Sequence, residues 1–106
     1  MTESNTFEKI KQDITNHPVL LYMKGTAEQP MCGFSAQVVQ ILKSYGVGFE
    51  TRNVLEDGDL REGIKQFTNW PTIPQLYVKG KFVGGCDIVT DMHRKGQLKA
   101  LLTPVA

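Results

Sequence analysis

Residues 24–35 read Lys-Gly-Thr-Ala-Glu-Gln-Pro-Met-Cys-Gly-Phe-Ser and join two patterns of different kinds. An apolar run, Val19-Leu-Leu-Tyr-Met23, ends just before them, and an amphipathic helical pattern begins at or just before Phe34. Cys32 therefore lies where a strand gives way to a helix. Unsatisfied N–H groups and the positive end of the helix dipole stabilise a thiolate there, so the pKa of this thiol is predicted to be lowered.

Cys32 has a charged residue nearby but no second cysteine. Lys24 can add a positive charge close to the thiolate. A dithiol redox motif would carry cysteine at position 35, where this sequence has Ser35. Cysteines often only fill space in an interior, yet a position before Gly33 at a helix start favours an exposed, functional thiol. The segment is predicted to be a one-thiol site.

The composition is that of an ordinary globular protein. Its 106 residues are 41% hydrophobic and 22% charged, which suits a single domain over residues 1–106 without disulfides or metal. The net charge of +1 gives no electrostatic reason to expect nucleic acid or a membrane as partner. No apolar run approaches the roughly 20 residues that span a bilayer.

Cysteine usage and the first residues indicate a reducing compartment. Cys32 and Cys86 are far apart and do not resemble the disulfide framework of a secreted protein. Met1-Thr-Glu-Ser-Asn-Thr6 lacks the basic and apolar regions of a signal peptide and the arginines of a transit peptide. A cytoplasmic location is expected.

The residues before position 24 predict a helix and then a buried strand. Asn5-Thr-Phe-Glu8 resembles a capping box, and apolar residues follow at helical spacing as far as Ile14. Pro18 is expected to end this helix near Asn16. Val19–Lys24 is short and mostly apolar, as expected of a strand buried on both faces of a parallel or mixed sheet.

Two further helices and a strand follow the cysteine segment. The helix from Phe34 is expected to stop at Gly46 or Gly48. Phe49–Val54 alternates as a half-exposed strand does. A third helix then begins, for which Asp57 and Asp59 are alternative N-terminal caps.

The last third of the chain predicts a hairpin and a final helix. Two prolines exclude a helix from Trp70-Pro-Thr-Ile-Pro74. Gln75–Lys79 and Lys81–Gly84 form a predicted hairpin, and Asp87 is the predicted cap of a helix that Gly96 interrupts. The resulting order predicts an α/β protein with a four-stranded mixed sheet flanked by helices, which is a thioredoxin-like fold with an extra N-terminal helix.

Three motifs together resemble one protein family. They are Cys32-Gly-Phe-Ser35 after a strand, Trp70-Pro-Thr-Ile-Pro74 before another strand, and Gly84-Gly-Cys-Asp87 at the start of the last helix. In this order and spacing they resemble the monothiol glutaredoxins of the CGFS class, over essentially the whole chain. The loop Gly25–Met31 agrees, because it is longer than the corresponding turn of dithiol glutaredoxins.

The resemblance implies a glutathione site next to Cys32. It implies a cis peptide bond before Pro74, although X–Pro bonds are cis in only about 5–6% of folded cases. Such a bond leaves the Ile73 backbone free to pair with an extended peptide. The family's binding positions fall on Lys24 and Arg61 for the glycine-end carboxylate, Ile73 for backbone pairing, and Cys86 and Asp87 for the γ-glutamyl end.

Each charged residue of this set also has a plain structural interpretation. Lys24 can be a solvated lysine at a strand end, Arg61 an exposed helix residue, and Asp87 only a helix cap. Taken singly, these interpretations are preferable for Lys24 and Arg61. Their agreement with one family pattern favours the functional interpretation for both.

Cys86 is the ambiguous residue. The resemblance implies a role mainly through its backbone, so its thiol is interpreted first as a small buried group. A disulfide with Cys32 under oxidation and a metal ligand are the alternatives.

Four other side chains receive weaker predictions. Trp70 is expected to form a wall of the glutathione groove, although core packing would explain it equally well. Phe34 can be partly exposed next to the thiol, but its position one helical turn before Val38 favours partial burial in the core. His17 and His93 have no spacing that suggests metal binding and receive no role.

Two functions are compatible with one thiolate, and a third rests on the same chemistry. The first is glutathione-dependent thiol–disulfide exchange, or deglutathionylation, by the monothiol route. The second is carriage and transfer of a [2Fe-2S] cluster, which the resemblance favours because CGFS glutaredoxins are cluster carriers with weak oxidoreductase activity. The third is a regulatory adaptor that senses iron through the cluster.

Counting ligands predicts how a cluster would be held. A [2Fe-2S] cluster commonly needs four thiolates, and one chain supplies Cys32 while bound glutathione supplies another. Two chains with two glutathiones complete the set, which predicts a cluster-bridged homodimer and an apo monomer. The resemblance adds heterodimers with BolA-type proteins and apo iron–sulfur acceptor proteins as partners.

Overall fold

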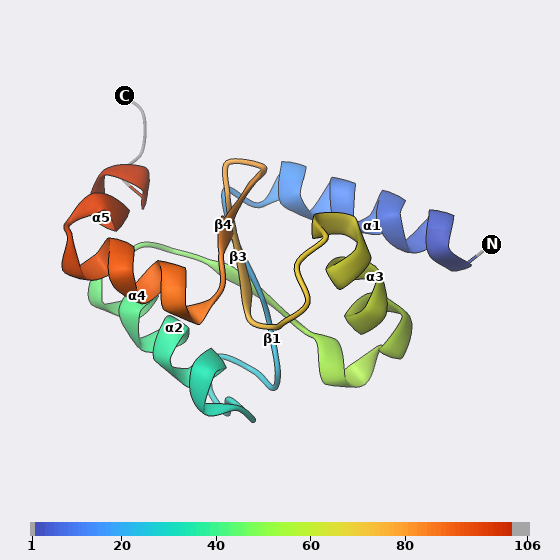
Figure 1. Ribbon diagram of the computed structural model, residues 1–106, viewed down its shortest axis with the longest axis horizontal. Coiled ribbons are helices and arrows are strands. Elements are labelled where there is room, and N and C mark those ends of the chain that lie inside the picture. The colour runs from blue at the N-terminus through green and yellow to red at the C-terminus, as the bar shows by residue number, and fades with distance from the viewer. Residues whose placement is uncertain (1, 103–106) are drawn as a thin grey trace.

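The computed structural model describes residues 2–102 as alternating helices and strands (Figure 1). In chain order they are α1 (Thr2–Asn16), β1 (Val19–Met23), α2 (Gly33–Ser44), β2 (Glu50–Asn53), the 3-10 helix η1 (Val54–Glu56), α3 (Gly58–Thr68), β3 (Gln75–Val78), β4 (Lys81–Gly84), α4 (Cys86–Arg94) and α5 (Gln97–Leu102). This order matches the predicted succession, with η1 added after β2. The two ends of the predicted 1–106 domain, Met1 and residues 103–106, lie outside the described residues.

The four strands form one mixed sheet in the order β2-β1-β3-β4. β1 is parallel to β2 and antiparallel to β3, while β3 and β4 form the predicted antiparallel hairpin. Every residue of β1 is buried, which confirms the prediction of a strand covered on both faces. The predicted thioredoxin-like architecture, with its extra N-terminal helix, is thus confirmed.

Hydrophobic residues form two clusters, one on each face of the sheet. Successive residues of β1 alternate between them, because side chains along a strand point to opposite faces. Leu21 and Met23 pack with α2, α4 and α5, whereas Leu20 and Tyr22 pack with α1 and α3. Figure 1 shows the same division of helices around the strands. A shift of β1 by one residue relative to its neighbouring strands would turn each of these side chains toward the opposite face of the sheet. The burial of both sets therefore fixes the register of β1 and with it the position of the loop that leads to Cys32.

The start of α1 differs from the prediction. α1 begins at Thr2, so Asn5 lies inside the helix and does not cap it. Packing on α3 holds α1 in place, with Ile10 fully buried and the rings of Phe7 and Phe67 5.6 Å apart in an edge-to-face arrangement. Because tertiary packing stabilises this helix, a possible capping residue in its first turns does not decide where it starts.

The ends of α3 and the start of α4 position residues near the cysteines. Asp57 caps α3, since its carboxylate accepts a hydrogen bond of 3.1 Å from the Leu60 N–H. Asn69 ends α3 in the left-handed conformation, with φ 57°. The prediction that Asp87 caps α4 is wrong, because Gly85 occupies the cap position and Asp87 lies in the first turn. The acidic side chain remains at the positive end of the helix dipole.

The last helix is divided as predicted. α4 ends at Arg94, Gly96 takes a left-handed φ of 77°, and α5 begins at Gln97. Among residues 2–102 no helix has the length and apolar composition needed to cross a lipid bilayer.

Candidate functional site

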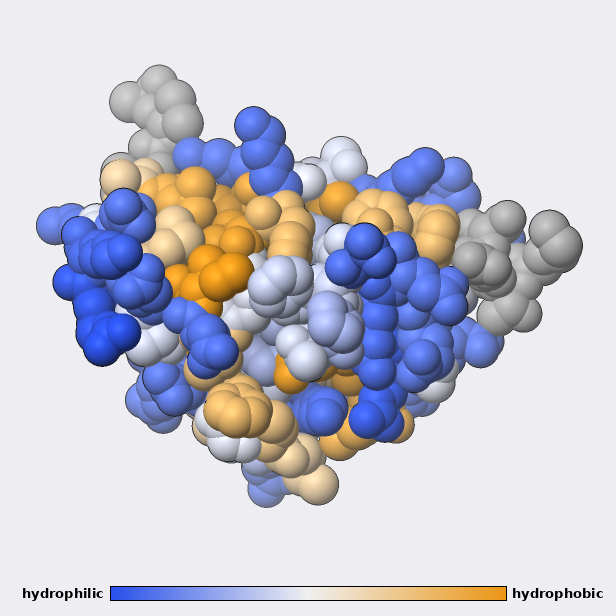
Figure 2. All heavy atoms as spheres, in the orientation of Figure 1, coloured by the Kyte–Doolittle hydropathy of each residue, from blue (hydrophilic) through white to orange (hydrophobic). Residues whose placement is uncertain are grey.

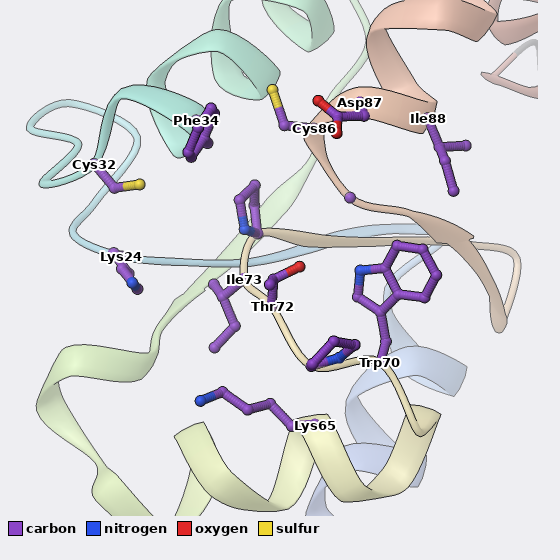
Figure 3. Close-up of a pocket in the computed structure, with 13 residues that line it drawn as sticks. Lys24, Cys32, Phe34, Lys65, Trp70, Thr72, Ile73, Cys86, Asp87 and Ile88 are labelled. Atoms are coloured by element: carbon purple, nitrogen blue, oxygen red, sulfur yellow. The ribbon is translucent and has the colours of Figure 1, made fainter.

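Three connections meet at one end of the sheet and enclose a pocket of about 420 Å³. They are the loop from β1 to α2, the loop from α3 to β3, and the short link from β4 to α4. Of the residues predicted for the site, the structure brings five together around this pocket: Lys24, Cys32, Ile73, Cys86 and Asp87 (Figure 3). The sixth, Arg61, is absent from the pocket lining.

Cys32 is half-exposed at the start of α2. Its backbone is extended (φ −155°, ψ 134°) and the helix begins at the next residue, Gly33. The backbone N–H of Ser35 is the strongest influence and lowers the pKa of the Cys32 thiol below its ordinary value. Burial opposes this change, whereas the Phe34 N–H, the charge of Lys24 and the Ser35 hydroxyl also lower the pKa. The pKa shift thus has the predicted direction, and helix N–H groups contribute more than Lys24.

Ser35 is fully buried and serves the loop before the cysteine. Its hydroxyl oxygen accepts a hydrogen bond of 3.1 Å from the Lys24 N–H, while the Lys24 carbonyl accepts one of 2.9 Å from the Met31 N–H. Gly25 has φ 90°, and a Cβ there would lie 2.5 Å from the Met31 nitrogen. The loop therefore folds back tightly on itself, and this fixes the position of Cys32 beside the pocket.

The surface beside Cys32 is apolar. Phe34 is 62% exposed and Met31 is 69% exposed, so the predicted partial burial of Phe34 is wrong. Val38, one turn later on α2, is 1% exposed and belongs to the hydrophobic cluster, so the covered part of α2 begins after Phe34. Figure 2 shows hydrophobic atoms at the lower edge of this face, over the N-terminal end of α2.

The loop from α3 to β3 forms the opposite wall. The Ile73–Pro74 peptide bond is cis, which confirms what the resemblance implied. Trp70 lines the pocket as expected, and its ring lies 5.6 Å from that of Phe82. Among the described residues, the Ile73 N–H and C=O have no hydrogen-bond partner within the chain. The backbone of Ile73 is therefore free to pair with a ligand.

Cys86 differs from Cys32 although both line the pocket. Cys86 belongs to the hydrophobic cluster against α2, is 9% exposed, and has its sulfur 3.9 Å from the Thr90 hydroxyl oxygen. Figure 3 shows its thiol directed toward α2, whereas the Cys32 thiol points toward the pocket. Both cysteines are free thiols. This placement agrees with the interpretation of Cys86 as a small buried group.

Lys65 is a charged pocket residue that was not predicted from the sequence; the apolar Ile88 is another lining residue without a predicted role. Lys65 lies four residues after Arg61 on α3, so the two side chains share a face of the helix one turn apart. Its ammonium lies 3.6 Å from the Glu62 carboxylate, which is largely exposed and competes weakly for it. The helical spacing from Arg61 was the signal that could have identified Lys65.

The chain matches a known family over most of its length. The glutaredoxin family model matches residues 19–83. The chain is 52% identical over 102 residues to the probable monothiol glutaredoxin 2 of Rickettsia felis, covering 96% of this chain and 98% of that protein. It is 48% identical over 103 residues to glutaredoxin 4 of Escherichia coli strain K12, covering 97% and 90%. The chain therefore belongs to the glutaredoxin family, in its monothiol class.

Solved structures show the same relationship. Reduced apo GrxS14 of poplar matches with a TM-score of 0.76 and 48% identity, covering 92% of this chain and 86% of that one. A buckwheat glutaredoxin–glutathione complex matches with a TM-score of 0.85 and 25% identity, covering 95% and 90%. Some relatives are much longer. Monothiol glutaredoxin-S11 of rice is 56% identical over 92 residues, which are 87% of this chain but 19% of that protein.

Proposed function

We propose that this glutaredoxin binds glutathione in the pocket beside Cys32 and carries a labile [2Fe-2S] cluster that it transfers to other proteins. The observation that carries the proposal is a single accessible thiol of lowered pKa at the edge of a pocket with cationic and anionic ends. The similar buckwheat glutaredoxin was solved as a glutathione complex, which supports the choice of ligand.

Glutathione has the charges that this pocket can pair. It carries one ammonium and two carboxylates, and Figure 3 shows Lys24 and Lys65 on one side of the pocket and Asp87 on the other. We assign the glycine-end carboxylate to the two lysines and the γ-glutamyl carboxylate to the N–H groups at the start of α4, from Cys86 onward. The Asp87 carboxylate takes the ammonium, and the Ile73 backbone pairs with the peptide. Arg61 acts from outside the pocket through its charge.

The cluster is cargo, and the thiols present fit a shared site. Within residues 2–102 no group of three or more His, Cys, Asp or Glu side chains could hold a metal ion. One chain thus offers one accessible thiolate, Cys32, because Cys86 is buried. Two chains and two glutathione thiolates supply the four ligands that a [2Fe-2S] cluster commonly needs. Because two of these ligands are exchangeable guests, the cluster is labile and suited to transfer.

We place the protein in the cytoplasm, where it would exist in an apo state and a cluster-bound state. We expect an apo monomer and a cluster-bridged homodimer, with a BolA-type protein replacing one chain in a heterodimer and apo iron–sulfur proteins receiving the cluster. Anaerobic reconstitution with iron, sulfide and glutathione should give a coloured dimer that bleaches to a monomer in air. Visible absorption and gel filtration measure both properties, and a colourless protein or a coloured monomer would contradict the proposal.

Glutathione binding can be tested separately from the cluster. Lys65→Gln should weaken the affinity for reduced glutathione roughly tenfold, the effect of losing one charge-assisted hydrogen bond. Arg61→Gln is the matched control on the same helix face and should have a smaller effect, because Arg61 does not line the pocket. Titration calorimetry compares the two variants. An equal or larger effect of Arg61→Gln would reassign the carboxylate to Arg61.

Thiol–disulfide exchange is the second candidate function, favoured by the lowered pKa of Cys32. The Cys32 thiolate would attack the glutathionyl sulfur of a mixed disulfide, forming a Cys32–glutathione disulfide and releasing the other thiolate. A second glutathione thiolate would then restore Cys32 and leave as oxidised glutathione. Turnover of a small mixed disulfide, coupled to glutathione reductase, measures this activity. Fast turnover would make exchange the main function.

A further inference from the structure

Gln75 is a fully buried polar residue directly behind the pocket wall. Its side-chain nitrogen Nε2 donates to the carbonyl oxygens of Trp70 and Thr72, each at 3.2 Å. Its oxygen Oε1 lies 3.1 Å from the hydroxyl of Tyr77 and 3.2 Å from the hydroxyl of Thr68. The side-chain amide is therefore fully paired in a place that water does not reach.

The orientation of the Gln75 amide follows from its neighbours. Backbone carbonyls only accept hydrogen bonds, so the nitrogen must face Trp70 and Thr72. Burial raises the pKa of the Tyr77 phenol, which consequently stays protonated and donates to the amide oxygen. Only an amide satisfies both sides at once, because a carboxylate has no N–H and an aliphatic side chain has neither group.

The loop that Gln75 contacts is held by the buried side chain of Ile73, but its backbone has few hydrogen bonds. Among the described residues, positions 71–74 make one hydrogen bond, which the Thr72 carbonyl accepts from Gln75. The same segment, with Trp70, lines the pocket. Figure 3 shows Trp70, Thr72 and Ile73 along the wall that faces Cys32. Core packing therefore anchors the Ile73 side chain, while the Gln75 amide supplies the side-chain hydrogen bonds that fix the carbonyls of Trp70 and Thr72.

We propose that Gln75 is a positioning residue for glutathione: its buried amide fixes the carbonyls of Trp70 and Thr72 and so holds the Ile73 backbone in place for the ligand. This inference rests on the proposed binding of glutathione in the pocket. The amide does not touch the ligand. Its effect is to preform the binding edge, which removes the entropy that ordering a loose loop would cost at each binding event.

The test uses Gln75→Glu and Gln75→Met in the 106-residue chain. Gln75→Glu keeps the shape but loses both N–H donors, and Gln75→Met removes them without adding a charge. Each should weaken the affinity for reduced glutathione roughly tenfold or more. Trp70, the one tryptophan of the sequence, reports binding by fluorescence, and calorimetry repeats the measurement independently. The pH dependence of Cys32 alkylation should stay that of the unmodified protein, since Cys32 is held by a different loop.

Tyr77→Phe is the matched control. It removes a hydrogen bond from the same buried cluster but leaves the N–H donors of Gln75 on Trp70 and Thr72. Its glutathione affinity should change less than about threefold even if its stability falls as far as that of Gln75→Met. Equal affinity losses in Tyr77→Phe and Gln75→Met would overturn the inference, because cluster stability alone would then explain them.

Two further results separate the possible failures. If the unmodified chain binds no glutathione, the proposed function is wrong and Gln75 has no ligand to position. If the unmodified chain binds glutathione and both Gln75 variants bind it equally well while melting cooperatively, only the role of Gln75 is wrong.

Discussion

The chain places a cysteine at the start of two different helices, and the two thiols differ in almost every property that governs reactivity. Cys32 precedes α2, is half-exposed, and has a pKa lowered mainly by the Ser35 N–H. Cys86 is the first residue of α4, belongs to the hydrophobic cluster and lies near the Thr90 hydroxyl. Both contribute to the lining of one pocket.

The difference between these two cysteines shows that a helix N-terminus alone does not make a reactive thiol. At α2 the chain arrives through a tight loop beyond the end of the sheet, so the side chain can turn toward the pocket while the N–H groups face its sulfur. At α4 the chain arrives directly from β4, and the thiol is carried into the interface with α2. At the start of α2 the side chain of Cys32 is accessible from the pocket. At the start of α4 the thiol of Cys86 is buried, so only its backbone is available on the pocket side.

The largest expected effect comes from replacing each thiol in turn. Cys32→Ser should abolish cluster binding completely, because it removes the only accessible protein ligand. Cys86→Ser should retain the cluster, since a buried hydroxyl in reach of the Thr90 hydroxyl can replace the thiol. The visible spectrum after anaerobic reconstitution distinguishes the two variants. Loss of colour in Cys86→Ser, with an unchanged fold by circular dichroism, would mean that both cysteines are ligands.

Glycine-to-alanine changes at the two helix starts should have effects of opposite sign. A Cβ at Gly85 would lie 3.2 Å from the Pro74 carbonyl oxygen and 3.3 Å from the Trp70 indole nitrogen, so Gly85→Ala should destabilise the fold by about 1–3 kcal/mol. A Cβ at Gly33 meets nothing within 4 Å, so Gly33→Ala should stabilise it by about 0.4–1 kcal/mol.

Urea denaturation of these two glycine variants measures the difference, with unmodified protein as the reference. Gly85→Ala should also weaken glutathione binding, because it displaces the pocket wall on both sides of the ligand. Equal stability of the two variants would show that the contact between α4 and the Trp70–Pro74 loop can relax without cost.

The smallest expected effect concerns the Ser35 hydroxyl. Ser35→Ala removes the weakest of the contacts that lower the pKa of Cys32 and leaves the dominant Ser35 N–H in place. The pKa should therefore rise slightly, and the rate of Cys32 alkylation at neutral pH should fall roughly twofold. Iodoacetamide labelling as a function of pH checks this. A large fall in rate would mean that the hydroxyl is essential for a reactive thiol, either directly or through its hydrogen bond to the Lys24 N–H, and that the helix backbone alone is not sufficient.

The fold and the position of Cys32 could be predicted because their signals are local, whereas the other pocket positions came from the resemblance to monothiol glutaredoxins. The apolar run of β1, the two prolines of residues 70–74 and the glycines at chain reversals each constrain the backbone where they occur. Asp57, one of the two predicted alternatives, caps α3, since a cap depends on neighbours in sequence. The prediction that Asn5 caps α1 was wrong because α1 is stabilised by packing on α3, which is distant in sequence, and so extends on the N-terminal side of Asn5.

The three features that were not predicted from the sequence depend on how helices, strands and loops are placed relative to one another in space. Phe34 has the spacing of a core residue but is largely exposed, and periodicity along a helix does not show which of its turns the rest of the chain covers. Lys65 lines the pocket, whereas Arg61, one turn earlier on α3, does not, and the sequence alone does not show which turn of a helix faces a pocket. Gln75 is recognisable only after the carbonyls of Trp70 and Thr72 are seen beside it.

In the proposed cluster site each chain supplies one thiolate and each bound glutathione supplies another. Acid denaturation of the reconstituted, desalted protein tests this, because it releases the bound glutathione, which can be counted per chain and per cluster. One glutathione per chain and one cluster per pair of chains are expected. A stable cluster in protein that releases no glutathione would contradict this set of ligands.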